Sequence, residues 1–417
     1  MAEKYTRLKY ACYTANITIS VVGNLSPILF MTFRSLYGIS YSLLGLLVLI
    51  NFSMQLATDL VFSFFSHKFN IPKTVQNSPL FAVVGFLIYA IWPYIFQEHI
   101  YLGLVIGTII FSASSGLAEV LMSPVIAAIP SENPEREMSK LHSIYAWGVV
   151  GVVVFSTIFL YLFGKENWQV LGLVFAIIPL MSAVLFRTSI VPELETPERV
   201  SGAISMLKNK TLWLCIIAIF VGGASECSMS QWCSGYLEQT LNIPKVQVDV
   251  FGVALFATML GFGRSLYAKI GNNIERVLFL GVVGATLCYF VAAISNIALI
   301  GFLACGLTGF CVSILWTGCL LVASNRIPTG GVFIYAMMAA GGDLGASVGP
   351  QLVGIITDVA IESNYILQLA DKYGYTVEQL GMKCGMLTGM IFPFVGIFIF
   401  LYILKTKQKV QGEHVYE

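Results

Sequence analysis

Residues 168–187 read WQVLGLVFAIIPLMSAVLFR, and the only charged residue among them is the final arginine. A helix of about 20 apolar residues spans the hydrocarbon core of a bilayer, which is about 30 Å thick. The rest of the chain contains eleven more stretches of this kind. We therefore predict twelve membrane spans, near residues 10–33, 41–65, 79–96, 100–129, 138–163, 168–187, 212–236, 246–270, 276–295, 297–325, 331–357 and 385–404.

The composition agrees with a protein that lies mostly in lipid. Of the 417 residues 57% are hydrophobic and only 11% are charged, with a net charge of +1. A soluble domain carries about 25% charged residues, so the composition excludes a soluble enzyme, a disordered chain and a nucleic-acid binder with a basic face. The apolar residues form continuous runs, whereas a membrane β-barrel needs alternation. We predict an all-α polytopic membrane protein.

The lysines and arginines predict the orientation of the chain. If the N-terminus is cytoplasmic, the loops on that side carry 17 of these residues and the loops on the other side carry 5. Such an excess marks the cytoplasmic side, so we expect both termini there. The compact loops favour a bacterial inner (plasma) membrane. The part of the loop 358–384 that reads ESNYILQLADKYGYTVEQL is expected to form a short amphipathic helix at the outer surface.

The longest hydrophilic interval separates the first six spans from the last six. We predict an N-terminal six-helix bundle at 1–187, a cytoplasmic linker at 188–211 and a C-terminal six-helix bundle at 212–417. The halves also repeat weakly at an offset near 198–201, and an offset of 198 places Pro130 on Pro328, Glu119 on Thr317 and Gly151 on Gly349. Parallel repeats of six spans are typical of secondary transporters, whose substrate site lies between the halves at mid-membrane.

Twelve spans, a repeat of six and basic loops after the second and eighth spans resemble the major facilitator superfamily over essentially the whole chain. Its loop signature, Gly-x3-Asp-Arg-x-Gly, is degraded here to Ser63-x3-His67-Lys68-x-Asn70, without the acidic residue. The resemblance implies two helical bundles related by a pseudo-twofold axis. It also implies transport by rocking of the two halves around a central site.

Three segments resemble the branch of fucose–galactose–glucose proton symporters: NLSPILFMTF (24–33), GLAEVLMSP (116–124) and GGASECSMSQWCSGYL (222–237). Glu119 matches an acidic residue of that branch in the fourth span. The acidic residue that the branch has in the first span is missing here. Glu226 and Trp232 match an acid followed by a tryptophan in the seventh span of related branches.

Four carboxylates fall well within predicted spans, namely Asp59, Glu119, Glu226 and Asp343, and Arg264 is the only span-buried cation. Each central charge costs about 2.5–3.5 kcal/mol on insertion scales, so most of these acids need hydrogen bonds, a wet cavity or a proton. A carboxyl group whose proton depends on its surroundings suits a proton-coupled transporter. We predict proton coupling at Glu119 and Glu226, and a gating or ion-pair role for Asp59 and Arg264.

The residues around the acids favour a hydroxylated solute as substrate. Polar side chains recur at helical spacing next to each acid, and tryptophans lie inside spans five, seven and ten. Sugars bind by stacking their C–H faces on aromatic rings while amides and carboxylates bind the hydroxyls. The predicted substrate-binding residues are Asn24, Gln55, Trp147, Glu226, Gln231, Trp232, Trp316 and Asp343.

The sequence thus favours a proton-coupled symporter of a small hydroxylated solute, a sugar for example, with sodium as the other possible coupling ion. The alternative is a proton antiporter of the same superfamily that exports drugs or cations attracted by the same acids. A receptor or lipid scramblase has no specific support. An enzyme is disfavoured because no nucleophile–base pair or metal spacing occurs. We expect a monomer in the bilayer, with no cofactor and no nucleic-acid partner.

Overall fold

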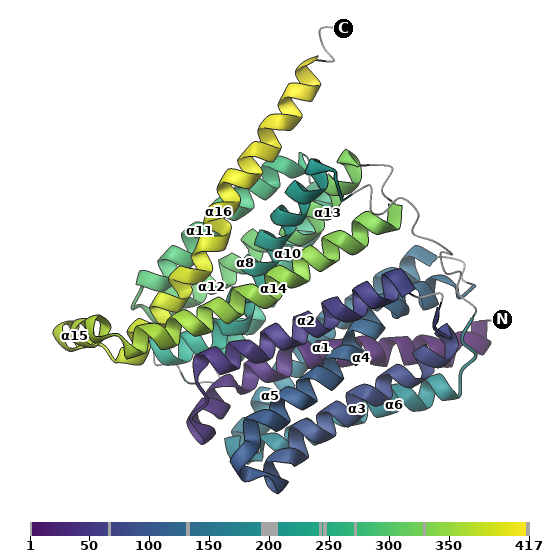
Figure 1. Ribbon diagram of the computed structural model, residues 1–417, viewed down its shortest axis with the longest axis horizontal. Coiled ribbons are helices and arrows are strands. Elements are labelled where there is room, and N and C mark those ends of the chain that lie inside the picture. The colour runs from purple at the N-terminus through teal and green to yellow at the C-terminus, as the bar shows by residue number, and fades with distance from the viewer. Residues whose placement is uncertain are drawn as a thin grey trace. The chain divides into compact units, whose positions relative to one another are not determined.

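The computed structural model describes residues 2–65, 68–130, 134–192, 207–241, 244, 248–270, 273–327 and 331–413. These residues form helices joined by short connections and contain no strand (Figure 1). The all-α prediction is therefore confirmed. The helices of the first half are α1 (Ala2–Tyr37), α2 (Tyr41–Phe65), α3 (Ile71–Ile95), α4 (Ile100–Ala127), α5 (Pro134–Phe163) and α6 (Trp168–Arg187).

The second half begins with the long helix α8 (Lys210–Leu241) and ends with α16 (Val377–Glu413). A π-helix, Val248–Val253, leads directly into α10 (Ala254–Ile270). The short helix α15 (Asn364–Tyr373) lies where the amphipathic surface helix is predicted. The other helices are α11 (Ile274–Ile294), α12 (Ala298–Val312), α13 (Leu315–Arg326) and α14 (Gly331–Glu362).

Within the described residues, ten helices are long and apolar enough to cross a membrane. The two remaining predicted spans, the fifth and the eighth, are also helical. Of α5 the apolar part Trp147–Phe163 qualifies as a shorter apolar helix, and the eighth span is divided between the π-helix and α10. The described residues therefore fit a polytopic protein with the twelve predicted spans.

One predicted span is not a single continuous helix. The stretch 297–325 was expected to form one helix, but α12 ends at Val312 and α13 begins at Leu315. At the break the Ser313 hydroxyl donates a hydrogen bond to the Phe310 carbonyl at 2.7 Å. A polar side chain that bonds the preceding turn in this way competes with the regular helical hydrogen bonds.

The contacts divide the chain into two compact units. The first unit comprises Met1–Ile39 and Ile50–Val200, and the second comprises Ser40–Leu49 and Ser201–Glu417. Helix α2 therefore contributes its first turns to the second unit and the rest to the first. Residues 193–206 of the predicted linker lie outside the described part of the chain.

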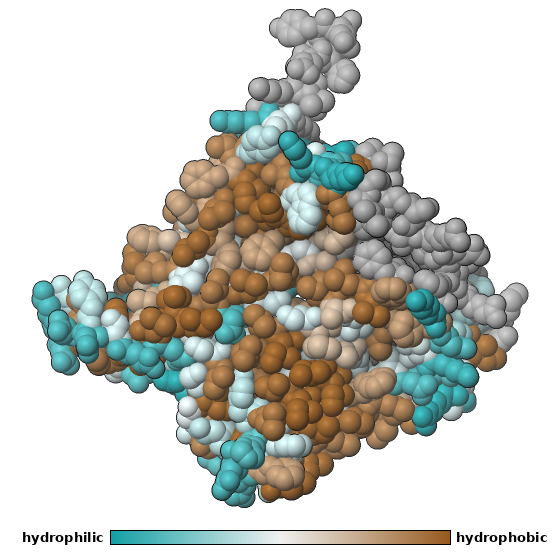
Figure 2. Space-filling model, viewed as in Figure 1, coloured by the Kyte–Doolittle hydropathy of each residue, from teal (hydrophilic) through white to brown (hydrophobic). Residues whose placement is uncertain are grey.

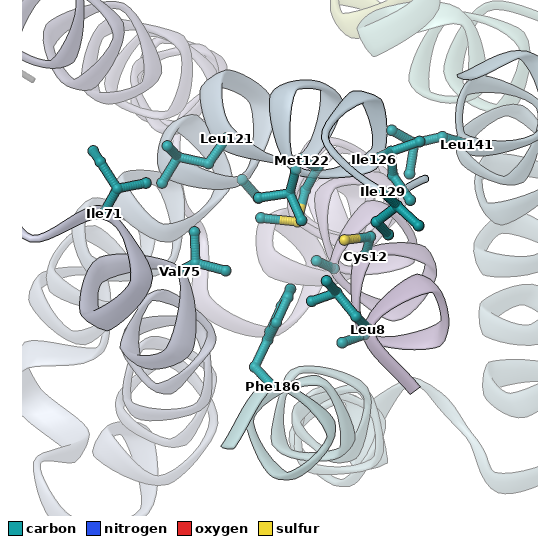
Figure 3. Packing of buried hydrophobic residues seen from close by; sticks show 14 of the residues in the cluster. Leu8, Cys12, Ile71, Val75, Leu121, Met122, Ile126, Ile129, Leu141 and Phe186 are labelled. Carbon is teal, nitrogen blue, oxygen red and sulfur yellow. The ribbon is translucent and has the colours of Figure 1, made fainter. Parts of the chain in front are cut away.

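The core of the first unit shows why its helices pack as they do. Side chains from all six helices α1 to α6 converge in one apolar cluster, with Met122 near its centre (Figure 3). Leu8 and Cys12 of α1, one turn apart, enter it from the same helix face. In lipid such packing is driven by close contact between side chains rather than by exclusion of water.

In the second unit α8 and α14 approach closely because glycines face their contact. A Cβ atom at Gly345 would lie 2.0 Å from the Phe220 carbonyl oxygen, and one at Gly349 would lie 2.5 Å from the Ser228 hydroxyl. Small residues of this kind allow helix backbones to approach in membranes. The outward faces of the helices carry apolar side chains, which appear brown in Figure 2 and suit contact with lipid tails.

Candidate functional site

A ladder of polar side chains joins α2 and α4 inside the first unit. The Asn51 Oδ1 accepts hydrogen bonds from Ser112 Oγ at 2.6 Å and from Gln55 Nε2 at 3.1 Å. One turn further, Gln55 Oε1 accepts a hydrogen bond from Ser115 Oγ at 3.3 Å. Gly116 lets the backbones approach, because a Cβ there would lie 3.0 Å from Gln55 Cα. Gln55, which we predicted to bind substrate, is hydrogen-bonded to Ser115 of α4 in this conformation.

Asp59 and Glu119 form the next rung of this ladder. Each follows the Gln55–Ser115 rung by one helical turn, and the two carboxylates are close enough to interact electrostatically. The Oδ1 of Asp59 is buried and has no hydrogen-bond partner among the described residues. The Glu119 side chain retains exposed surface. Two neighbouring carboxylates repel each other unless one of them binds a proton or a cation neutralises the pair.

The polar stripe of α1 packs against α5. Asn16 Nδ2 donates a hydrogen bond to the Leu141 carbonyl at 2.8 Å, and Ser20 Oγ donates one to the Tyr145 carbonyl at 2.9 Å. Asn24, which we predicted to bind substrate, donates to the Ser20 carbonyl of its own helix. These bonds satisfy the donors that would otherwise be unpaired in lipid.

Trp147, the predicted aromatic ligand of the first unit, lies on α5. Its side chain is 74% exposed, so the ring is not packed in a helix contact. None of the hydrogen bonds found among the described residues connects it to Asp59 or Glu119. Its predicted role in substrate binding remains a prediction.

In the second unit Glu226 of α8 forms an ion pair with Arg264 of α10. Arg264 Nη2 lies 3.7 Å from Glu226 Oε1, and the side chains are 43% and 19% exposed respectively. Arg264 Nε also donates a hydrogen bond to the Ser313 carbonyl at 3.1 Å, at the break between α12 and α13. The guanidinium thus connects Glu226 to that break. The second carboxylate oxygen of Glu226, Oε2, is buried without a hydrogen-bond partner among the described residues.

Trp316 follows the break directly, as the second residue of α13. Its ring lies against Gly342 of α14, and the next residue of α14 is the buried Asp343, which is 6% exposed. Cys227, adjacent to Glu226, interacts electrostatically with both Glu226 and Asp343. The second unit therefore brings together four of the predicted residues: Glu226, Arg264, Trp316 and Asp343.

Gln231 and Trp232 occupy a different environment on α8. Trp232 is fully buried, donates its Nε1–H to the Pro350 carbonyl at 2.9 Å and packs 5.8 Å from the ring of Tyr41. In this conformation it offers no free ring face to a solute. Gln231 is 8% exposed, and its Oε1 has no hydrogen-bond partner among the described residues. Substrate binding by these two residues remains a prediction.

The sequence interpretation overlooked Asp358 of α14. Its carboxylate accepts hydrogen bonds from the backbone N–H groups of Tyr41 at 3.1 Å and Ser42 at 2.6 Å, the first residues of α2. An acidic residue directly after a predicted span is the only sequence signal for this contact. The break at Ser313 was also overlooked, since neither proline nor glycine occurs at 313–314.

Comparison with known proteins places this arrangement in a family. The family model described as Major Facilitator Superfamily matches residues 11–350. A search of curated protein sequences gives no match.

Several solved structures share the fold. A bacterial homologue of the human lysosomal transporter Spinster, inward-facing and occupied, is 12% identical over 97% of each chain, with a TM-score of 0.70. The nucleoside transporter NupG is 11% identical over 94% of this chain and 99% of its own, with a TM-score of 0.71. The E. coli fucose:proton symporter FucP is 13% identical over 96% of this chain and 99% of its own, with a TM-score of 0.60.

At such identities these structures support the fold alone, whereas the family model covers most of the chain. The family and its structural neighbours are transporters, not enzymes. The apolar helices require a bilayer around them. On these grounds the chain belongs to the Major Facilitator Superfamily and is a multi-pass membrane transporter.

Proposed function

We propose that this transporter is a proton-coupled symporter of a small hydroxylated solute, with a sugar as the favoured class. The observation that carries the proposal is the pair Asp59 and Glu119 at the end of the α2–α4 ladder. Two of the similar structures are named as a fucose:proton symporter and a nucleoside transporter, and both of these solutes contain a hydroxylated ring. The resemblance of 24–33, 116–124 and 222–237 to the fucose–galactose–glucose branch supports the same class.

The proton step is assigned to the carboxyl pair. When Glu119 is protonated, the pair carries a single negative charge and the repulsion between the two carboxylates is removed. Loss of the proton leaves two neighbouring negative charges, which lipid and protein disfavour. This proton step requires that the exposed surface of Glu119 faces water, so that the proton can enter and leave. Binding and release of one proton therefore changes the energy of this unit strongly.

Solute binding is assigned to the cluster in the second unit. The unpartnered Oε2 of Glu226 can accept a hydroxyl hydrogen bond, while Arg264 stabilises the charge on the same carboxylate. Trp316 retains some exposed surface close to this cluster and can contact the C–H face of a ring. Asp343 adds a second acceptor. Transporters of this type alternate access by rocking one half against the other around such residues.

The test measures uptake into proteoliposomes with an imposed inward proton gradient, against a panel of sugars and nucleosides. We expect Glu119→Gln to abolish proton-driven accumulation while solute counterflow continues, because counterflow needs no net proton movement. The control is Glu98→Gln, which changes an exposed glutamate between α3 and α4. If Glu119→Gln leaves both accumulation and counterflow at the wild-type level, the coupling scheme is wrong.

A second candidate is proton-coupled export of cationic drugs. The observation that favours it is the excess of acids, because Asp59 and Glu119 have no cation among their described contacts while Arg264 pairs with Glu226. A growth-inhibition panel with and without the protein separates the two candidates. Broad resistance to cationic compounds favours export, and uptake of a single sugar or nucleoside favours symport.

A further inference from the structure

Gly342 of α14 packs directly against the ring of Trp316. A Cβ atom at this position would lie 2.4 Å from Trp316 Cη2, 2.5 Å from Cζ3 and 2.8 Å from Cζ2. Carbon atoms do not approach one another so closely, so any side chain at position 342 would displace the indole. The other glycines of α14 differ in this respect. Gly345 and Gly354, for example, face backbone carbonyls of Phe220 and Tyr41.

The backbone gives no reason for a glycine here. Gly342 lies within a helix and has no positive φ, so an alanine would fit the local conformation and would favour the helix more. The neighbouring ring is therefore the physical reason that a side chain is excluded. Gly223 of α8 also packs against this ring, since a Cβ atom added at Gly223 would lie 3.2 Å from Trp316 Cζ3.

Trp316 is also fixed at its own backbone. It lies three residues after Ser313, whose carbonyl accepts the hydrogen bond from Arg264, and Arg264 pairs with Glu226. The six-membered ring of the indole therefore packs against Gly342 and Gly223. The backbone of Trp316 belongs to the first turn of α13. Some of its surface remains exposed. A ring fixed in this way has a defined position next to the acids of the second unit.

We propose that Gly342 is a specificity-determining position that acts through Trp316 and sets the size of the solute ring that the transporter accepts. This inference rests on the proposed function, in which Trp316 contacts the solute. A side chain at position 342 must move the indole by about 1 Å to restore ordinary contact distances. Because Trp316 contacts the solute in the proposed function, a displaced ring takes space from the solute, so larger ring solutes such as nucleosides are affected before pentoses.

The experiment compares Gly342→Ala with Gly261→Ala, a helical glycine of the same unit whose Cβ would meet nothing within 4 Å. Each variant is reconstituted, and KM and maximal rate are measured for a pentose, a hexose and a nucleoside that the wild-type protein transports. We expect Gly342→Ala to raise KM for the largest of these solutes by about tenfold, with a smaller rise for the smallest and little change in maximal rate. Gly261→Ala should leave all three KM values unchanged.

The same substitution in a Trp316→Phe protein separates an effect that acts through Trp316 from a general loss of folding or activity. In Trp316→Phe the shorter ring leaves room beside position 342, so adding Gly342→Ala should change KM no further. Tryptophan fluorescence gives a readout independent of transport, since Gly342→Ala should shift the emission in the presence of Trp316 and not in its absence. If Gly342→Ala alone fails to fold while the double variant folds, the result directly supports a steric clash between a side chain at position 342 and the ring of Trp316.

Two results would overturn the inference. One is a folded Gly342→Ala protein whose KM for the largest solute rises no more than its KM for the smallest, and the other is an equal effect with and without Trp316. Failure of the proposed function looks different, because the wild-type protein would then show no proton-driven uptake of any solute in the panel.

Discussion

The backbone N–H of Ser42 donates a hydrogen bond of 2.6 Å to the carboxylate of Asp358, across 316 positions of sequence. The other carboxylate oxygen accepts the N–H of Tyr41, so Asp358 caps the first turn of α2 from α14. Gly354, one turn earlier on α14, permits the approach, because its Cβ would lie 2.4 Å from the Tyr41 carbonyl oxygen. All four residues belong to the second compact unit. The start of α2 is therefore held by a charged cap that its own sequence does not supply.

Removal of this cap should destabilise the second unit. Asp358→Ala leaves two N–H groups without their acceptor and should lower the free energy of unfolding by about 1 kcal/mol, with Asp358→Asn less harmful because its amide oxygen still accepts one bond. Thermal unfolding in detergent measures the difference. Asp371→Ala, on the exposed face of α15, is the control. Equal unfolding midpoints for the two alanine variants would contradict the cap.

A second prediction concerns Asp59, which is close enough to Glu119 to interact with it electrostatically and has a buried oxygen without a hydrogen-bond partner among the described residues. Asp59→Asn keeps the shape of the side chain but removes one of the two negative charges that bind the shared proton. We expect proton-driven accumulation of solute to fall by about tenfold or more, while counterflow stays within about twofold of wild type. Asp371→Asn should change neither measurement. If Asp59→Asn accumulates solute normally, the proton is bound by Glu119 without its neighbour.

The membrane architecture could be predicted from the sequence because span length and apolar character are local properties. The polar stripes of α2 and α4 were also readable, since Asn51, Gln55 and Asp59 recur at intervals of one turn. Periodicity shows that these residues share a face. It does not show which helix that face meets, so the pairing with Ser112, Ser115 and Glu119 appears only in the structure.

The features that the sequence does not predict, such as the helix break at Ser313 and the burial of single tryptophan rings, depend on contacts between distant elements. The break at Ser313 lies in an apolar stretch without proline, and its carbonyl is bound by Arg264, 49 positions away. Trp232 and Trp316 both lie within predicted spans, yet one is fully buried against Pro350 and the other keeps exposed surface. Burial of a single ring depends on the packing of three or four helices, which no local pattern contains.

The Glu226–Arg264 ion pair supports a third prediction. The distance of 3.7 Å and the 43% exposure of Arg264 indicate a weak pair, so a double-mutant cycle with Glu226→Gln and Arg264→Gln should give a coupling of about 0.2–1 kcal/mol in unfolding experiments. Arg264→Lys keeps the charge but loses the Nε donor to the Ser313 carbonyl. We therefore expect Arg264→Lys to raise KM for solute with little change in stability. A coupling near zero would show that the two side chains act independently.

Gly116 provides a fourth prediction, on the ladder that carries the carboxyl pair. A Cβ at this position would lie 2.9 Å from Thr58 Cβ and 3.0 Å from Gln55 Cα, so Gly116→Ala must push α4 away from α2. We expect a loss of about 1–3 kcal/mol in the free energy of unfolding from this overpacking. The shift also lengthens the hydrogen bonds from Ser112 and Ser115, and proton-driven uptake should fall with it.

The matched control for this variant is Gly151→Ala on α5, because a Cβ at Gly151 meets nothing within 4 Å. Alanine favours a helix over glycine, so this variant should be as stable as the wild type or slightly more stable. Thermal unfolding and uptake are measured for both variants in parallel. Should Gly116→Ala match Gly151→Ala in both measurements, the close approach of α2 and α4 at this rung would not be needed for transport, and the carboxyl pair would have to be held by other contacts.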